Sequence, residues 1–155
     1  NSFVLDIGSA PGGWSELIKG MTPSSSVYAI DLLPMDPING VMFFQEDIIN
    51  IDEIKEIFLL KSKFNLVISD LAPNLTGIRA VDEENISELN IITLDTALGY
   101  LSKSNGSFII KTFQNSLLKK LRTEMEKSFH LVQTYKPAAS KSKSAEIYLY
   151  GERPL

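Results

Sequence analysis

Two acidic residues and one lysine stand where apolar runs of the sequence end. Asp31, Asp70 and Lys111 each close a stretch that reads as a buried β-strand. The carboxyl ends of parallel strands meet at one edge of an open α/β sheet, and ligands bind in the crevice there. Carboxylates and an amine that face one crevice can bind ligand hydroxyls, move a proton or stabilise a developing charge. We therefore expect these three side chains to belong to one site.

The stretch 4–14 reads VLDIGSAPGGW, which predicts a buried strand, a loop of small residues and the start of a helix. Its glycines leave the main chain uncovered at the strand end, so that a ligand can lie against it. The dinucleotide fingerprint G-x-G-x-x-G is not met, because Ala10 replaces its second glycine, and the lysine of a phosphate-binding P-loop is missing. Asp6 suits a cationic ligand better than an anionic one. The pattern resembles the first motif of S-adenosylmethionine-dependent methyltransferases, whose cofactor carries a sulfonium cation.

The composition is that of one soluble globular domain: 155 residues, of which 44% are hydrophobic and 22% charged. The chain has no cysteine and one histidine, so we expect no disulfide, no thiolate nucleophile and no metal site. No apolar run reaches the roughly 18 residues that cross a bilayer, and no signal peptide opens the chain. These features predict a cytoplasmic protein without membrane contact, or an organellar one if its source is eukaryotic.

The charged residues are unevenly distributed along the chain. The net charge of -4 argues against a protein that holds nucleic acid by bulk electrostatics alone. Residues 82–95 include five acids and no base, whereas residues 136–143 include three lysines and no acid. This pattern predicts one acidic and one basic face.

Apolar runs and turn signals predict the elements that position these side chains. Strands are expected at 4–7, 27–31, 41–45, 64–70, 107–113, 131–135 and 145–150. Helices are expected from 13 or 14 to 19, and over 52–60, 83–102 and 117–129. Strands that alternate with helices, followed by two strands without a helix between them, predict a mostly parallel seven-stranded sheet with an antiparallel edge strand.

Five motifs in this order resemble the FtsJ/RrmJ-type ribosomal RNA 2′-O-methyltransferases, and the resemblance covers nearly all 155 residues. The segments that carry it are 6–14, 31–38, 69–74, 110–114 and 136–148. The resemblance implies a Rossmann-like, class I methyltransferase fold in a single domain, residues 1–155. It also implies a further lysine in a segment upstream of the first strand, so we expect this chain to lack part of the family's active site and to bind cofactor better than it methylates.

The resemblance implies S-adenosyl-L-methionine as the cofactor and assigns residues to it. The cofactor-binding set is Gly8, Ala10, Gly12, Gly13, Trp14, Asp31, Leu32, Asp47 and Asp70. The catalytic set is Asp70, Lys111 and Glu146, and no metal is implied. Glu146 enters through the resemblance alone, because its place at the start of the last strand equally suits a surface carboxylate.

The role of Lys111 remains open at the level of sequence. An ordinary lysine has a pKa near 10.4, so only about one in 2,500 is neutral at pH 7. Burial and the sulfonium charge lower the pKa, whereas Asp70 and Glu146 raise it. If burial and the sulfonium charge have the larger effect on the pKa, Lys111 is the general base for the ribose hydroxyl. If the carboxylates dominate, it stays charged and orients the hydroxyl or stabilises charge.

The expected substrate is ribosomal RNA or the large ribosomal subunit, with a uridine ribose as the methylated group and a monomer as the active species. Lys136, Lys141 and Lys143 precede Glu146 and are the candidate contacts to RNA phosphates. A transfer RNA or an mRNA cap remains an alternative substrate, and a noncatalytic RNA-binding or ribosome-assembly factor with the same fold an alternative function. An amino-group methyltransferase is disfavoured, because the residues after Asp70 lack a Pro-Pro-aromatic element.

Overall fold

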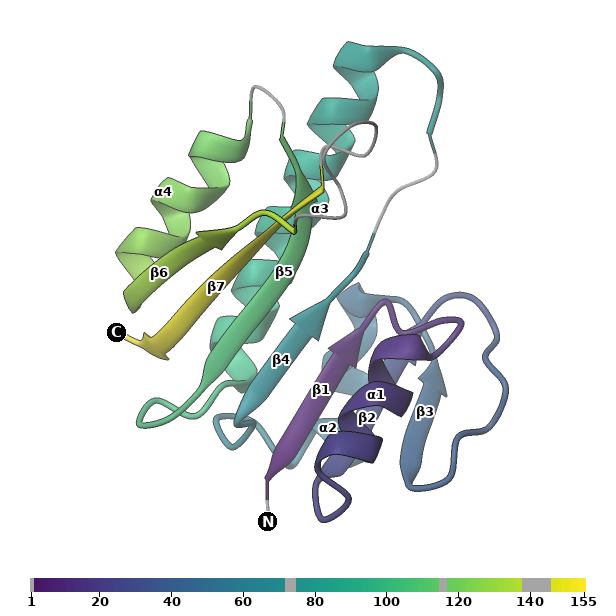
Figure 1. Ribbon diagram of the computed structural model, residues 1–155. Coiled ribbons are helices and arrows are strands. Elements are labelled where there is room, and N and C mark those ends of the chain that lie inside the picture. Colours follow the sequence, from purple (N-terminus) through teal and green to yellow (C-terminus); the bar gives the residue numbers. More distant parts are fainter. Residues whose placement is uncertain (1, 72–74, 115–116, 138–145) are drawn as a thin grey trace.

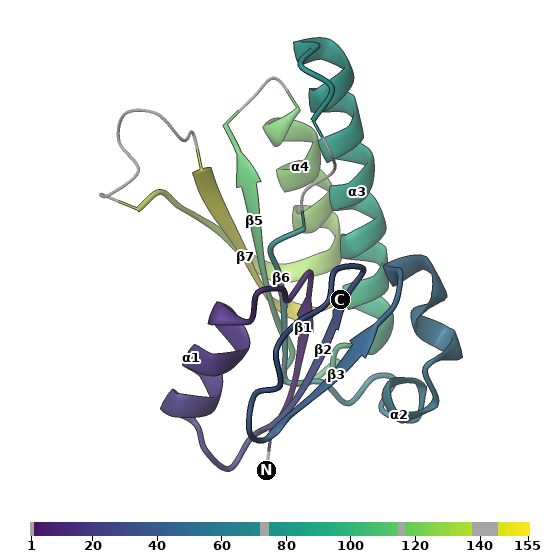
Figure 2. The ribbon, with the colours of Figure 1, turned by 90° about the vertical axis from the view of Figure 1, so that its right-hand side faces the viewer.

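A computed structural model describes residues 2–71, 75–114, 117–137 and 146–155, and these form a seven-stranded sheet with helices on both faces (Figures 1 and 2). The strands are β1 Phe3–Ile7, β2 Ser26–Asp31, β3 Val41–Gln45, β4 Leu66–Ser69, β5 Ser107–Phe113, β6 Phe129–Tyr135 and β7 Glu146–Pro154. The helices are α1 Gly13–Met21, the 3-10 helix η1 Ile48–Glu53, α2 Lys55–Phe58, α3 Arg79–Tyr100 and α4 Leu118–Ser128.

The sheet has the strand order β3-β2-β1-β4-β5-β7-β6, and its first five strands are parallel. β7 pairs antiparallel with both β5 and β6, so the reversed strand is inserted between them (Figure 1). The prediction of a mostly parallel sheet with antiparallel pairing at one edge is therefore confirmed. The chain order reverses beside β1, where β2 lies on one side and β4 on the other, and ligands bind at such a switch point.

The two faces of the sheet are covered unequally. Figure 2 shows α1 on one face, and α2, α3 and α4 on the other. Residues of β5 alternate between buried and half-buried, because successive side chains point to opposite faces. The buried ones, such as Phe108 and Ile110, belong to the main core, whereas Lys111 lies on the half-buried face.

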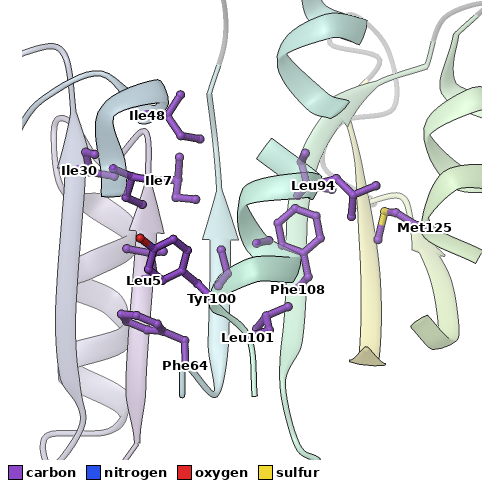
Figure 3. Packing of buried hydrophobic residues seen from close by; sticks show 14 of the residues in the cluster. Leu5, Ile7, Ile30, Ile48, Phe64, Leu94, Tyr100, Leu101, Phe108 and Met125 are labelled. Carbon is purple, nitrogen blue, oxygen red and sulfur yellow. The ribbon is translucent and has the colours of Figure 1, made fainter. Parts of the chain in front are cut away.

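The main core lies between the sheet and α3 (Figure 3). Leu5 and Ile7 from β1 and Leu94 and Tyr100 from α3 are almost completely inaccessible to solvent. Burial of one such side chain stabilises the fold by about 1.5–3 kcal/mol. The core thus holds the parallel strands rigidly, and with them the residues at their carboxyl ends. In the described part of the chain, no helix has the length and apolar character that a membrane span needs.

The helix expected over 52–60 is replaced by two short helices, η1 and α2, which are separated at Ile54. The Asp47 side chain accepts a hydrogen bond from the Ile49 amide and so begins a 3-10 helix upstream of the predicted start. Ile54 has an extended backbone and ends it. Sequence spacing of Ile54 and Ile57 indicated one buried face correctly, since both are buried, but not the break between the helices.

Candidate functional site

Lys111 lies between two carboxylates at the carboxyl edge of the sheet. Its Nζ atom is 2.5 Å from Asp70 Oδ1 and 3.1 Å from Glu146 Oε2. Asp70 follows β4, which is parallel to β5, while Glu146 begins the antiparallel strand β7. The ends of two strands and the start of a third therefore meet at one point. All three side chains keep partial exposure, so a substrate can approach them.

The environment of Lys111 favours the charged amine. Burial lowers the pKa of Lys111, but hydrogen bonds and negative charge from Asp70 and Glu146 raise it by more, so that the pKa lies above its ordinary value. In this arrangement the side chain is an ammonium that donates hydrogen bonds to both carboxylates. Of the two roles open at the level of sequence, the geometry favours the orienting cation over the neutral base.

The glycine-rich loop is held close to β2 by main-chain contacts. The amides of Gly8 and Ser9 both donate to the Ile30 carbonyl, at 2.8 and 3.2 Å. Gly8 has a φ of 76°, and a Cβ atom there would lie 2.8 Å from a methyl carbon of Leu71. Only glycine fits this position without displacement of its neighbours. The loop main chain is thus fixed at the switch point of the sheet.

Asp31 joins this loop to the following one. Its Oδ2 atom accepts a hydrogen bond from the Ala10 amide at 2.8 Å, and its Oδ1 atom accepts one from the Leu33 amide at 2.9 Å. An ionised carboxylate offers about four lone-pair positions, so each oxygen can accept a further bond. Asp31 is therefore able to hold both loops and bind a pair of ligand hydroxyls at the same time.

A cavity of about 460 Å³ opens beside Asp31 at this edge. Its lining combines apolar side chains with a few carboxylates, a composition typical of small-molecule sites. Ile7, Ile30 and Leu71 form apolar walls, while Asp31 and Asp47 contribute the acids. The volume, the exposed glycine main chain and the two carboxylates fit an adenosyl group with a ribose diol.

A smaller cavity, which has no room for a bound molecule, lies next to the catalytic candidates and is lined in part by Asp6, Trp14 and Asp70. Burial raises the pKa of Asp6 to about 6, although a hydrogen bond from Ser15 at 2.6 Å opposes the shift. The Trp14 ring packs against Tyr148, with 5.9 Å between the ring centroids. An acid kept partly neutral by burial gains from a nearby cation, so this corner suits the positively charged end of a ligand.

The structure places the predicted cofactor residues in three ways. Gly8, Asp31, Leu32 and Asp47 line the larger cavity, and Trp14 and Asp70 line the smaller one. Ala10 reaches the site through its hydrogen bond to Asp31, whereas Gly12 precedes α1 with a φ of 118° and Gly13 begins that helix. The roles of these residues in cofactor binding remain predictions.

The candidate RNA contacts are only partly described. Lys136 follows β6 and donates a hydrogen bond to Gln114 Oε1 at 3.2 Å. Lys141 and Lys143 lie outside the described residues. Gln114 directly follows β5, so Lys136 lies near the carboxyl end of the strand that carries Lys111.

Sequence reasoning missed three residues of the site. Asn85 and Glu88 from α3 line the larger cavity, and Tyr148 packs against Trp14. Asn85 and Glu88 are three residues apart on one helix face, which is a detectable signal, but the charge pattern places only Glu88 in a group, that of the surface acids at 82–95. Tyr148 pairs directly with Lys111 across β5 and β7, a relation that depends on strand register.

Comparison with known proteins identifies close relatives. Residues 1–153 match the family model described as FtsJ-like methyltransferase. The chain is 41% identical over 154 residues to ribosomal RNA large subunit methyltransferase E of Neisseria meningitidis serogroup C, with 97% of this chain and 74% of the relative covered. The enzyme of the same name from Buchnera aphidicola is 40% identical over 149 residues, with 94% and 71% covered.

A solved structure of a ribosomal RNA methyltransferase from Plasmodium falciparum superimposes with a TM-score of 0.86 at 31% identity. The match covers 100% of this chain and 87% of that one. The likeness therefore extends over every element that positions the site.

Proposed function

This chain belongs to the FtsJ-like methyltransferase family, and on that premise we propose that it methylates a ribose 2′-hydroxyl of large-subunit ribosomal RNA. Its cofactor is S-adenosyl-L-methionine, which supplies an electrophilic methyl group on a sulfonium centre when bound. The observation that carries the proposal is the Lys111 cluster with Asp70 and Glu146, at the same sheet edge as a cavity that fits an adenosyl group. The relatives named above support ribosomal RNA as the substrate.

We assign cofactor binding to the larger cavity and the glycine-rich loop beside it, with Asp6 and Asp70 as neighbouring acids. Asp31 accepts hydrogen bonds from the ribose hydroxyls while it holds the Ala10 and Leu33 amides. Asp47 lies in the same cavity and accepts from the adenine amino group. Asp6 and Asp70 provide negative charge near the positively charged end of the cofactor. Together these contacts fix the direction from which a nucleophile must approach.

Lys111 positions the ribose hydroxyl and Asp70 receives its proton in this proposal. The ammonium donates a hydrogen bond to the hydroxyl oxygen and keeps it in line with the methyl carbon. Such positioning can supply about 7–11 kcal/mol of the barrier. Asp70 is the carboxylate nearer to Lys111, and it would accept the hydroxyl proton while the methyl group passes from the sulfonium sulfur to the ribose oxygen, which leaves a neutral thioether. Glu146 holds the ammonium from the other side.

We further propose that the methylated nucleotide is a uridine and that the protein acts as a monomer in the cytoplasm, on ribosomal RNA or the large ribosomal subunit. Lys136 is the described candidate for a phosphate contact beside the catalytic cluster. Lys141 and Lys143, which lie outside the described residues, are proposed as further phosphate contacts.

The test is methyl transfer to large-subunit ribosomal RNA from cells in which the gene has been deleted. We expect the purified full-length protein to restore one 2′-O-methyl group, which reverse-transcription stops at low nucleotide concentration will locate. Lys111→Met is expected to slow the appearance of the signal about 10²–10³-fold, whereas the matched control Lys127→Met on the exposed face of α4 keeps the wild-type rate. Transfer to a base nitrogen or to no RNA would overturn the proposal.

A further inference from the structure

A second groove, of about 390 Å³, lies on the α3 face of the sheet, between the last turns of α3 and the segment that forms η1. Ile48 and Ile92 line both this groove and the cofactor cavity, so the two hollows are neighbours. Ile49 and Ile92 are apolar yet leave 69% and 41% of their surface exposed. The two isoleucines give the groove apolar surface that a partner can cover.

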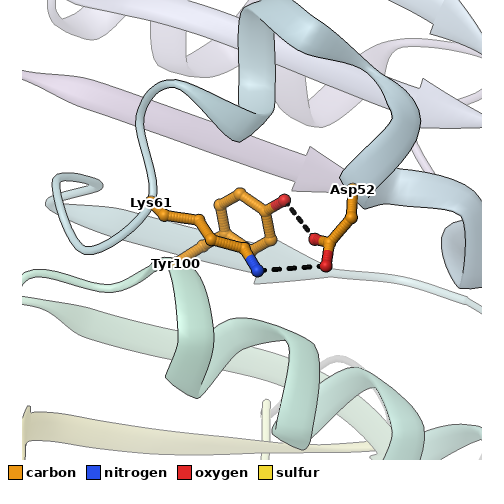
Figure 4. A network of polar contacts seen from close by, with 3 residues as sticks. All are labelled: Asp52, Lys61 and Tyr100. Carbon is orange, nitrogen blue, oxygen red and sulfur yellow. Dashed lines mark hydrogen bonds and ion pairs between the residues drawn. The ribbon is translucent and has the colours of Figure 1, made fainter.

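A polar network makes one wall of this groove rigid (Figure 4). Tyr100 donates a hydrogen bond of 2.6 Å to Asp52, and the Lys61 ammonium lies 3.0 Å from the same carboxylate. The Lys61 Nζ atom also lies 5.4 Å from the centroid of the Tyr100 ring. Asp52 therefore neutralises Lys61, which is the single cation among the described residues that line the groove. The wall exists without any bound partner.

Gly99 lines the groove where α3 is about to end. A Cβ atom at this position would meet nothing within 4 Å, so the packing of the chain itself does not require glycine. Glycine also destabilises a helix relative to alanine. A partner that approaches the helix main chain closely would account for the missing side chain. Gly20 of α1 has equal free space, but it lies on the other face of the sheet and is therefore a suitable control.

The exposed stripe of α3 that leads into the groove is acidic. Its members follow helical spacing and are Val81, Glu84, Glu88, Ile92, Asp95 and Gly99. Among the described residues, neither Glu84, Glu88 nor Asp95 forms an ion pair with a cation. This surface repels RNA phosphates and attracts positive charge. Its complement is apolar in the centre and basic at the edges.

We propose that this groove docks a cationic amphipathic segment of a partner protein. Apolar side chains of the segment pack against Ile49 and Ile92, and its backbone passes over Gly99. Lysine or arginine side chains at its edges pair with Asp95 and Glu84. This arrangement is the helix-in-groove mode of recognition, with charge pairs that set the orientation. The inference does not depend on the reaction that the protein catalyses.

Binding can be measured with a defined probe. We choose an 18-residue amphipathic peptide with leucines at helical spacing on one face and lysines beside them, labelled for fluorescence anisotropy. Two matched probes replace its lysines by glutamates or its leucines by glutamines. We expect the first probe alone to bind the wild-type protein, with an affinity that falls as salt rises. Equal binding of the glutamate probe would overturn the proposal.

Two substitutions test the location. Gly99→Trp fills the groove and Asp95→Lys reverses its charge, and each is expected to weaken binding of the lysine–leucine probe at least tenfold. Gly20→Trp is expected to leave the affinity within twofold. Both groove variants should retain methyl transfer, because neither residue belongs to the catalytic or cofactor sites. Unchanged affinity in correctly folded Asp95→Lys protein contradicts the proposal even if Gly99→Trp proves unstable.

The absence of cysteine from the chain allows a direct location of the probe. A single cysteine at the groove, in Thr96→Cys, should react with a maleimide-bearing probe at least tenfold faster than Thr123→Cys on α4, after each rate is divided by the rate with N-ethylmaleimide. In sedimentation equilibrium of the protein alone, we expect no dimer that is lost in Gly99→Trp. Equal normalised rates at the two cysteines, or such a dimer, would mean nonspecific attraction or self-association, and either result rejects the partner-docking proposal.

Discussion

Replacement of Lys111 by methionine removes the ammonium but keeps a chain of similar length between Asp70 and Glu146. A preorganised charged donor at a reacting centre commonly contributes a factor of 10²–10³ in kcat, or about 2.7–4 kcal/mol. We expect a loss of this size for Lys111→Met. The two carboxylates are left without a cation, but they retain partial exposure to water, so the cost in folding stability should be only about 1–2 kcal/mol. Lys111 lines neither cavity, so cofactor affinity should change by less than about threefold.

The pH dependence of the wild-type protein separates the two roles of Lys111. The carboxylates hold the pKa of Lys111 above its ordinary value of 10.5, so the amine remains charged from pH 7 to 9. An orienting cation therefore predicts a single-turnover rate, measured with cofactor bound in advance, that does not depend on Lys111 ionisation in this range. A general base with such a pKa predicts a rate that rises about tenfold per pH unit, in proportion to the neutral amine. That rise, lost in Lys111→Met, would refute the cation mechanism.

Three further substitutions probe the site. Asp31→Ala removes the acceptor for the Ala10 and Leu33 amides together with the proposed ribose contact, so calorimetry should show cofactor affinity weakened about 10- to 100-fold, or about 1.4–2.8 kcal/mol; unchanged affinity would exclude Asp31 from the site. Asp6 has a pKa of about 6 in the fold, against an ordinary value of 3.8, so the folded protein is more stable below pH 3.8 and loses that stability as the pH rises to 6. Asp6→Asn removes this ionisation and should stabilise the cofactor-free protein at pH 7.5 by up to about 3 kcal/mol in denaturant unfolding. The gain should vanish near pH 4. Lys136→Gln should weaken binding of an RNA fragment and reduce the slope of log affinity against log salt by about one unit, while an unaltered slope would show that Lys136 makes no phosphate contact.

The site residues on the parallel strands could be predicted from the sequence, because the carboxyl ends of parallel strands always meet at one edge of the sheet. Asp31 ends β2, Asp70 follows β4 and Lys111 follows the last residue of β5 that pairs with β4, so they had to reach the same edge once those strands were identified. The core is equally predictable, since the apolar runs at β1 and β4 are buried. The reaction itself came from the resemblance, because strand ends alone do not distinguish one cofactor from another.

Other features depend on tertiary pairing that the sequence does not express. Glu146 reaches Lys111 because β7 runs antiparallel, so that its first residue rather than its last lies at the active edge. Tyr148 faces Trp14 for the same reason. The direction of the Lys111 pKa shift depends on how closely Asp70 and Glu146 approach its Nζ atom, and these distances are known only from the structure. The break between η1 and α2 followed from the local hydrogen bond of Asp47, which competes with helical spacing.

The position of β7 inside the sheet has a consequence for the order in which the protein matures. β7 follows β5 and β6 in the chain but lies between them, and β6 pairs only with β7 among the described strands. During synthesis the first five strands can assemble as they emerge, because each pairs with a strand already made. β6 must wait for its partner, and Glu146 arrives with that partner. A nascent chain can therefore acquire the cofactor cavity before it acquires a complete catalytic cluster, so methylation competence is a property that emerges last.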